Sequence, residues 1–261
     1  MAPARIKDFK ESSAFLRDAG FCLRYWGNDS LPIASMYEAV LGKQRKPSTA
    51  DQKFAIQLTN QLLERHEAIE VNVIADRVCL VHRSIMPTLY SLVKEKSKSG
   101  AIPELSREAK EVLSLIQEKG QIVTGDVREL LGIPSTKTSD DPAYVVLNEL
   151  QRHLLIDRGP FKISNQAIPY LAKEGYPYHL FEEAHLELAK EGEEIKADQA
   201  RNQWLMAFLK ARGECSLRKM GSIFKVFLTK AEIESSVQEL VSARKLKSEK
   251  STGTLNASVM R

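Results

Sequence analysis

The chain has 261 residues, of which 43% are hydrophobic and 28% charged, and its formal net charge is +4. This hydrophobic fraction is ordinary for globular proteins, which excludes wholesale disorder and fibrous architectures. No run of about 18 apolar residues occurs, so we expect no membrane-spanning helix and no membrane partner. The length fits two domains of average size or three small ones.

The cysteines and the N-terminus predict a cytoplasmic protein. Cys22, Cys79 and Cys215 lie far apart and form no Cys-x-x-Cys pair, which argues against a disulfide framework and a structural zinc site. The N-terminal segment has no apolar signal-peptide core. Glycine-rich phosphate-binding motifs are absent as well, so we expect no cofactor.

The N-terminal segment of the chain is expected to form three helices followed by two paired strands. Glycines end the helices expected near 6–18 and 32–41, and a third is expected near 51–66. Alternating apolar residues at 69–73 and 78–82 then predict a hairpin. A further helix, near 85–96, leads into a Lys/Ser/Gly linker.

The central segment repeats this layout. Helix caps and stops are expected at Ser106, Gly120, Thr124 and Asp141. Residues 155–157 and 161–163 flank a Gly-Pro turn and predict a second hairpin. Three helices completed by two strands are the layout of a winged helix.

The sequence of the C-terminal segment predicts the same layout and is strongly basic. Gly213 is expected to end the first helix of this segment. Thr229 and Glu232 form a capping box before the third helix, and a Thr-Gly turn separates two expected strands. From Arg201 to Arg261 there are 12 basic and 5 acidic side chains, a net charge of +7. This charge predicts contact with a polyanion, although lysines that only confer solubility would give the same count.

Together these patterns predict a mostly helical α+β fold with tandem winged-helix (helix-turn-helix) domains. We expect an N-terminal winged-helix-like domain over 1–99 and a central winged helix with an aromatic docking segment over 100–192. A basic C-terminal winged helix should occupy 193–261.

The central phrases "VLSLIQEKGQIVTGDVRELLGI" and "LNELQRHLLIDRGPF" resemble the winged-helix family of bacterial DNA glycosylases that unhook interstrand crosslinks. The resemblance implies DNA binding, DNA repair and removal of damaged bases. In that family, activity is associated with a Gln-x-Asp or Gln-x-Gln motif. The corresponding positions here hold Leu23 and Tyr25, neither of which is expected to orient a hydrolytic water, so the resemblance points to a divergent relative.

Residues 24–29 carry side chains suited to nucleic acid. Arg24 and Trp26 are candidate DNA contacts, with Trp26 stacking on a base, and Asp29 is the candidate catalytic acid or base. The alternative is structural: Trp26 packs on the first core, and Asn28 and Asp29 cap the next helix.

The phrase Gly175–His185 combines aromatics, histidines and carboxylates. His179, Glu183 and His185 have no standard zinc spacing. We therefore expect no metal site and interpret the segment as a docking element between modules.

The central third helix opens with acidic residues, which repel phosphates. The C-terminal module is the better candidate for double-stranded DNA. Its proposed DNA contacts are Arg218, Lys219, Lys225, Arg244, Lys245 and Lys247.

Three functions remain open: a DNA-binding winged-helix protein, a DNA glycosylase acting on damaged bases, and a non-enzymatic module that binds a protein partner. Whether the chain is an enzyme is left undecided.

Overall fold

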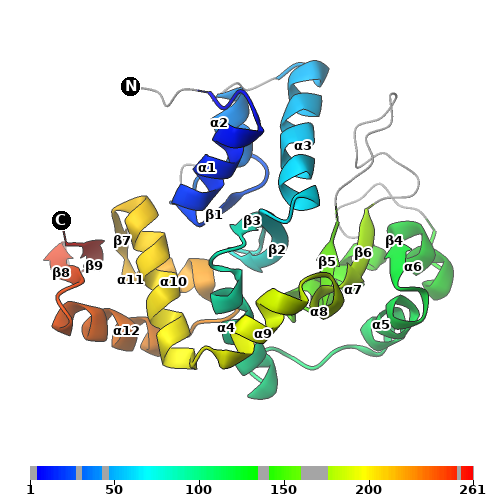
Figure 1. The fold of residues 1–261 in the computed structure, drawn as a ribbon. Coiled ribbons are helices and arrows are strands. Elements are labelled where there is room, and N and C mark those ends of the chain that lie inside the picture. The colour runs from blue at the N-terminus through cyan, green and yellow to red at the C-terminus, as the bar shows by residue number, and fades with distance from the viewer. Residues whose placement is uncertain are drawn as a thin grey trace.

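The computed structural model describes residues 5–27, 31–42, 47–134, 141–159, 176–251 and 254–260. The predicted mixture of predominant helices and short strands is confirmed, and the described strands form three small antiparallel sheets (Figure 1). Each sheet belongs to a unit with one order of elements: a helix, a short strand, two helices and two further strands.

The first unit contains the predicted helices and hairpin near their expected bounds. Its elements are α1 (Phe9–Ala19), β1 (Phe21–Leu23), α2 (Met36–Leu41), α3 (Thr49–Glu64), β2 (Ala68–Ile74) and β3 (Arg77–His82). Its sheet has the order β1-β3-β2. The helix that follows, α4 (Met86–Lys98), carries the chain toward the next unit.

The central unit has its third strand far along the chain from the second. Its elements are α5 (Arg107–Lys119), β4 (Gln121–Val123), α6 (Thr124–Leu131), α7 (Pro142–Arg152), β5 (Ile156–Arg158) and β6 (Pro177–Leu180). The sheet order is β4-β6-β5, so the described partner of β5 is β6. The aromatic segment expected to dock between modules therefore supplies the middle strand of this sheet. The expected strand at 161–163 lies outside the described residues.

The third unit follows two connecting helices, α8 (Phe181–Ala184) and α9 (Leu186–Glu194). Its elements are α10 (Ala197–Arg212), β7 (Glu214–Ser216), α11 (Leu217–Phe224), α12 (Lys230–Ser242), β8 (Leu246–Ser251) and β9 (Thr254–Val259). The sheet order is β7-β9-β8, and the expected capping box of Thr229 and Glu232 opens α12.

A glycine ends the first helix of each unit just before its short strand. Gly20, Gly120 and Gly213 all have positive φ angles, of 71°, 73° and 90°. Because glycine lacks a Cβ, it reverses the chain there without the strain that an L-residue would meet. The sequence predicted these stops correctly. It did not predict the three-residue strands, which are too short to show an alternating pattern.

The first sheet lies at the centre of the molecule and is buried on both faces. Cys22 and Leu80 pack with the helices of the first unit, whereas Phe21 and Val81 belong to a core that continues into α4, α9 and the third unit. In that second core the Phe21 ring stacks on Trp204 of α10, with 4.9 Å between ring centroids. The first and third units therefore share one hydrophobic core, while the central unit has a core of its own.

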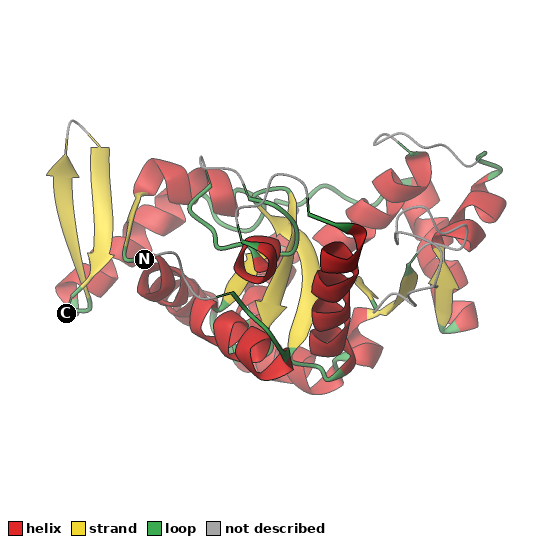
Figure 2. Cartoon of the chain, turned by 90° about the horizontal axis from the view of Figure 1, so that it is seen from above, coloured by secondary structure: helices red, strands yellow, loops and turns green. Residues whose placement is uncertain are grey.

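The β2–β3 turn contacts both neighbouring units. Asp76 in this turn pairs with Arg152 at the end of α7, at 3.1 Å, and with Lys225 after α11. The backbone N–H of Ala75 donates to the Ile223 carbonyl of α11 at 2.7 Å. Seen from above, the molecule is elongated, and the C-terminal hairpin projects at one end (Figure 2). Among the described helices, none is long and apolar enough to cross a membrane.

Candidate functional site

A buried charged cluster lies where the first and central units meet. Arg24 follows directly after β1, Glu70 belongs to β2 and Arg158 is the last residue of β5. One carboxylate oxygen of Glu70 pairs with the Arg24 guanidinium and the other pairs with that of Arg158. The side chains of Arg24 and Glu70 are each 1% exposed, so these charges are held away from solvent. We call these three residues the Arg-Glu-Arg cluster.

Two tyrosines cover this cluster. The Arg158 guanidinium carbon lies 4.1 Å from the ring centroid of Tyr176, and that of Arg24 lies 5.6 Å from it. The Arg24 carbon is also 5.5 Å from the Tyr25 ring. The two phenolic oxygens are 3.2 Å apart, within hydrogen-bond distance. The aromatic faces stabilise the guanidinium charges, as cation–π contacts do in desolvated sites.

The cluster carries more positive than negative charge. Two guanidiniums share the single carboxylate of Glu70, which leaves a formal excess of one positive charge in a buried place. Arg24 Nε and Arg158 Nη2 are buried and lack a hydrogen-bond partner in the part of the chain that the structure describes. Buried charge without a partner is costly.

The pKa directions follow from this imbalance. Burial raises the pKa of the Glu70 carboxyl, but Arg158 and Arg24 outweigh burial and hold the pKa below its ordinary value. Burial also raises the pKa of Tyr25, yet Arg24 and Arg158 again prevail, and the net pKa of this phenol is lowered. Burial dominates at Tyr176 instead, and its pKa is raised.

Sequence reasoning singled out Arg24 and included Tyr176 in the aromatic docking segment, and Tyr176 does contact Arg24 of the first unit. It missed Glu70 and Arg158. Glu70 alternates with apolar residues in its strand, a pattern typical of a side chain that faces solvent. The only signal was its place in the hairpin between Ile69 and Val71, and burial of both sheet faces could not be inferred from that.

The structure places Arg24 and Trp26 in different surroundings. Arg24 is buried in the Arg-Glu-Arg cluster and does not face solvent. Trp26 is 39% exposed, and its ring meets the edge of Tyr37 at 6.0 Å between centroids. Asp29, the candidate catalytic residue, lies outside the described residues. Leu23 is buried in the core, whereas Tyr25 contacts the cluster.

One histidine of the aromatic segment is paired with a carboxylate of β5. His185 Nε2 lies 2.8 Å from an Asp157 carboxylate oxygen, and both side chains are buried. In the described ranges, no group of three or more His, Cys, Asp or Glu residues is placed to hold a metal ion.

The six cationic candidates of the third unit occupy different surroundings. Arg218, Arg244, Lys245 and Lys247 are exposed, and Lys219 is half-buried. Lys225 is exposed but paired with Asp76. A cleft between α10 and the end of α12 is lined by Arg244 and Lys245, with Lys210 beside them, but not by Arg218 or Lys219. The candidates therefore divide into two groups on this unit.

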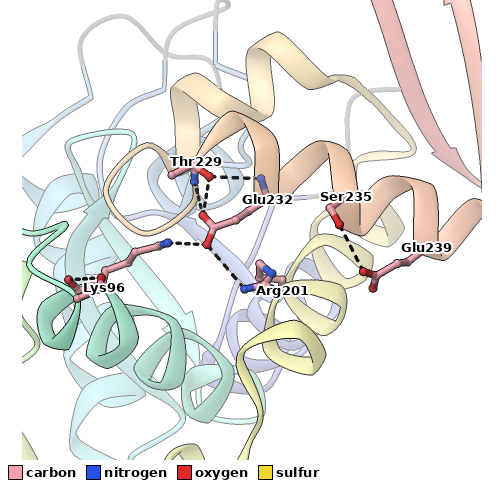
Figure 3. Close-up of polar contacts among 7 residues, drawn as sticks. Lys96, Arg201, Thr229, Glu232, Ser235 and Glu239 are labelled. Atoms are coloured by element: carbon pink, nitrogen blue, oxygen red, sulfur yellow. Dashed lines mark hydrogen bonds and ion pairs between the residues drawn. The ribbon is translucent and has the colours of Figure 1, made fainter.

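The start of α12 is held against the rest of the protein. Glu232 accepts a hydrogen bond from Lys96 of α4 at 2.5 Å, and Arg201 of α10 lies 3.7 Å from the same carboxylate oxygen (Figure 3). Glu232 also accepts from the backbone and hydroxyl of Thr229. The N-terminal end of this helix is thus engaged by α4 and α10, whereas its C-terminal end leads into the exposed basic residues.

Comparison with known proteins gives a likeness in fold. No protein-family model matches the chain, and no curated protein matches its sequence. Among solved structures, one is similar to this chain in fold. That structure is Streptomyces sahachiroi DNA glycosylase AlkZ, which is 12% identical and aligns with a TM-score of 0.57. The match covers 95% of this chain and 64% of that chain, so the present chain spans less than two thirds of its neighbour.

Proposed function

We propose that this chain is a tandem winged-helix protein that binds double-stranded DNA. Three units with one element order and one strand order support the winged-helix assignment, because each ends in a strand pair packed on three helices. The domain boundaries proposed with it are 1–99, 100–192 and 193–261. The fold likeness to a DNA glycosylase supports the same conclusion.

The observation that carries the proposal is a set of exposed cations without acidic partners. Arg218, Arg244, Lys245 and Lys247 make no ion pair with any residue that the structure describes. Free guanidinium and ammonium groups bind phosphates and release counterions from DNA. Lys219 extends the group near α11, and Lys225 is a weaker candidate because Asp76 already pairs with it.

The proposed contacts use the C-terminal end of α12 and the hairpin rather than the start of the helix. Glu232 and its partners Lys96 and Arg201 occupy the start of α12. The third helix of the central unit, α7, also contacts the first unit, since Asn148 accepts a hydrogen bond from Asn72 of β2 at 2.8 Å. We therefore propose phosphate contacts from the third unit, with Trp26 as an additional stacking surface and Arg24 in a structural role.

Salt-dependent DNA binding tests this proposal. Fluorescence anisotropy of a labelled duplex, between about 50 and 200 mM salt, should give a steep log–log slope. The fourfold variant Arg218→Gln, Arg244→Gln, Lys245→Gln, Lys247→Gln should reduce that slope by about 0.9 for each phosphate that the variant no longer neutralises.

A matched control removes the same number of charges from other surfaces. Lys10, Arg107, Lys110 and Lys190 are exposed residues of α1, α5 and α9, and their change to Gln should leave the slope nearly unchanged. An equal decrease in both variants, or no wild-type binding at low salt, contradicts the proposed surface.

The second candidate function is a DNA glycosylase, which the fold of the structural neighbour favours. Incubation with alkylated or crosslinked duplexes should then yield abasic sites, detected by strand cleavage in alkali. Asp29→Ala should abolish the product if Asp29 is the acid or base, whereas equal product from both proteins removes Asp29 from the mechanism.

The third candidate function is binding of a separate protein. A stoichiometric protein partner that co-purifies with the chain in the absence of nucleic acid would favour this function over DNA binding.

A further inference from the structure

The Arg-Glu-Arg cluster is one negative charge short of neutrality. Arg24 and Arg158 contribute two positive charges, and Glu70 is the described carboxylate that faces them. The other titratable groups that act on the two guanidiniums are the phenols of Tyr25, Tyr176 and Tyr178. Among the residues that the structure describes, the candidates for a balancing anion are therefore these three tyrosines.

Tyr25 is the phenol best placed to supply the anion. It is half-buried, whereas Tyr176 and Tyr178 are 5% and 1% exposed. Its hydroxyl lies 3.2 Å from that of Tyr176, which can donate a hydrogen bond to it. A phenolate at Tyr25 would thus accept one internal hydrogen bond and lie beside a guanidinium.

We propose that Tyr25 is an acid–base site, a phenol that ionises before Tyr176 and Tyr178 and then accepts a proton or hydrogen bond from a water or hydroxyl ligand. On ionisation the O–H bond breaks, the proton passes to solvent and the oxygen keeps the electron pair. The four-residue cluster of Arg24, Glu70, Arg158 and Tyr25 then has a formal charge of zero. The inference does not depend on DNA binding or on base removal.

The lowered pKa of Tyr25 agrees with this charge count. Burial raises the pKa, but Arg24 and Arg158 lower it by more, and the hydrogen bond from Tyr176 lowers it further. Burial raises the pKa of both Tyr176 and Tyr178, the latter to about 12. Tyr25 should therefore ionise first within the cluster.

Nuclear magnetic resonance of protein labelled with ¹³C at tyrosine Cζ tests the proposal, because this carbon shifts when the phenol ionises. The chain has 7 tyrosines, and Tyr25→Phe assigns its signal. We expect that signal to shift at lower pH than those of Tyr176 and Tyr178. Wild-type and variant proteins are compared only over the pH range in which circular dichroism shows the native fold.

Two further variants should shift the titration of Tyr25 in opposite directions, which tests the cause of its early ionisation. Tyr176→Phe removes a hydrogen bond that favours the phenolate, so Tyr25 should titrate at higher pH. Glu70→Gln removes the competing negative charge, so Tyr25 should titrate at lower pH wherever that variant remains folded. A Tyr25 signal that moves in neither variant would contradict the assigned cause.

Two results would overturn the proposal. In the first, the Tyr25 signal titrates no earlier than those of Tyr176 and Tyr178 in folded wild-type protein. In the second, inorganic phosphate raises the thermal stability of the wild type but not of Arg158→Gln, and the early step of Tyr25 is missing. The balancing anion would then be an external oxyanion.

Discussion

Glu70 joins the first and central units through a buried ion network. Its two carboxylate oxygens bind guanidiniums from different units. Loss of one member of a buried ion network leaves the remaining charges without compensation, which costs more than the intact network contributes.

Glu70→Gln should therefore lower the free energy of unfolding by about 3–5 kcal/mol at neutral pH. The folded pKa of Glu70 lies below its ordinary value of 4.5, so its stabilisation is complete above that pH and is lost as the pH falls through the folded pKa. Urea unfolding at about pH 7 and about pH 3 should show the difference between wild type and variant shrinking in acid. A difference that grows in acid would contradict the assigned charge state.

At the residue scale, the sequence predicted caps and stops better than it predicted the cluster. Thr229, Asp141 and Gly120 act through neighbours a few residues away, so local pattern is sufficient to identify them. Glu70, Arg158 and Tyr176 meet only after distant segments pack together. Nothing local distinguishes Glu70 and Arg158 from side chains that face solvent.

Among the elements, the packing of α9 on α4 depends on one small residue. Gly192 lies within α9, and a Cβ atom there would be 2.7 Å from the Pro87 carbonyl oxygen and 2.8 Å from the Tyr90 ring. Gly192→Ala should move the helices apart and cost about 1–3 kcal/mol, measured by urea unfolding.

Gly221→Ala is the matched control, because Gly221 lies within α11 and has open space around its Cβ position. This change should stabilise the protein by about 0.5–1 kcal/mol, since alanine favours helix over glycine. Equal destabilisation by the two changes would show that loss of glycine, rather than close approach to α4, causes the effect.

Helices were predicted more successfully than strands for a physical reason. Caps, stops and apolar faces marked α5, α7 and α12 in the sequence. Strands β1, β4 and β7 have three residues each, and they exist because a hairpin from elsewhere in the unit pairs with them. The partner of β5 was likewise set by pairing across a long separation, which the nearer Gly-Pro turn did not reveal.

At the scale of the whole molecule, the shared core should couple local unfolding of the first unit to that of the third unit. The ring of Phe21 in β1 stacks on two aromatic rings of α10, those of Trp204 and Phe208. The Phe21 and Phe208 ring centroids are 5.9 Å apart. Phe21→Ala should cost about 3–5 kcal/mol. Hydrogen exchange followed by mass spectrometry should show faster exchange in β3 and in α11 and α12 together.

Leu147→Ala in α7 is the control for this coupling, because Leu147 belongs to the separate core of the central unit. Its faster exchange should concentrate in α5, α6 and α7. If Phe21→Ala changes exchange in the first unit alone, the shared core does not make the two units open together.

The double attachment of the Asp76 turn has a mechanical consequence. Arg152 and Lys225 hold one loop from opposite sides, and the Ala75 backbone adds a third tether. These contacts oppose rotation of the central and third units about the turn. A ligand that contacts both units therefore binds to a rigid surface. Under the proposed DNA-binding function, the duplex rather than the protein would then bend or twist to fit.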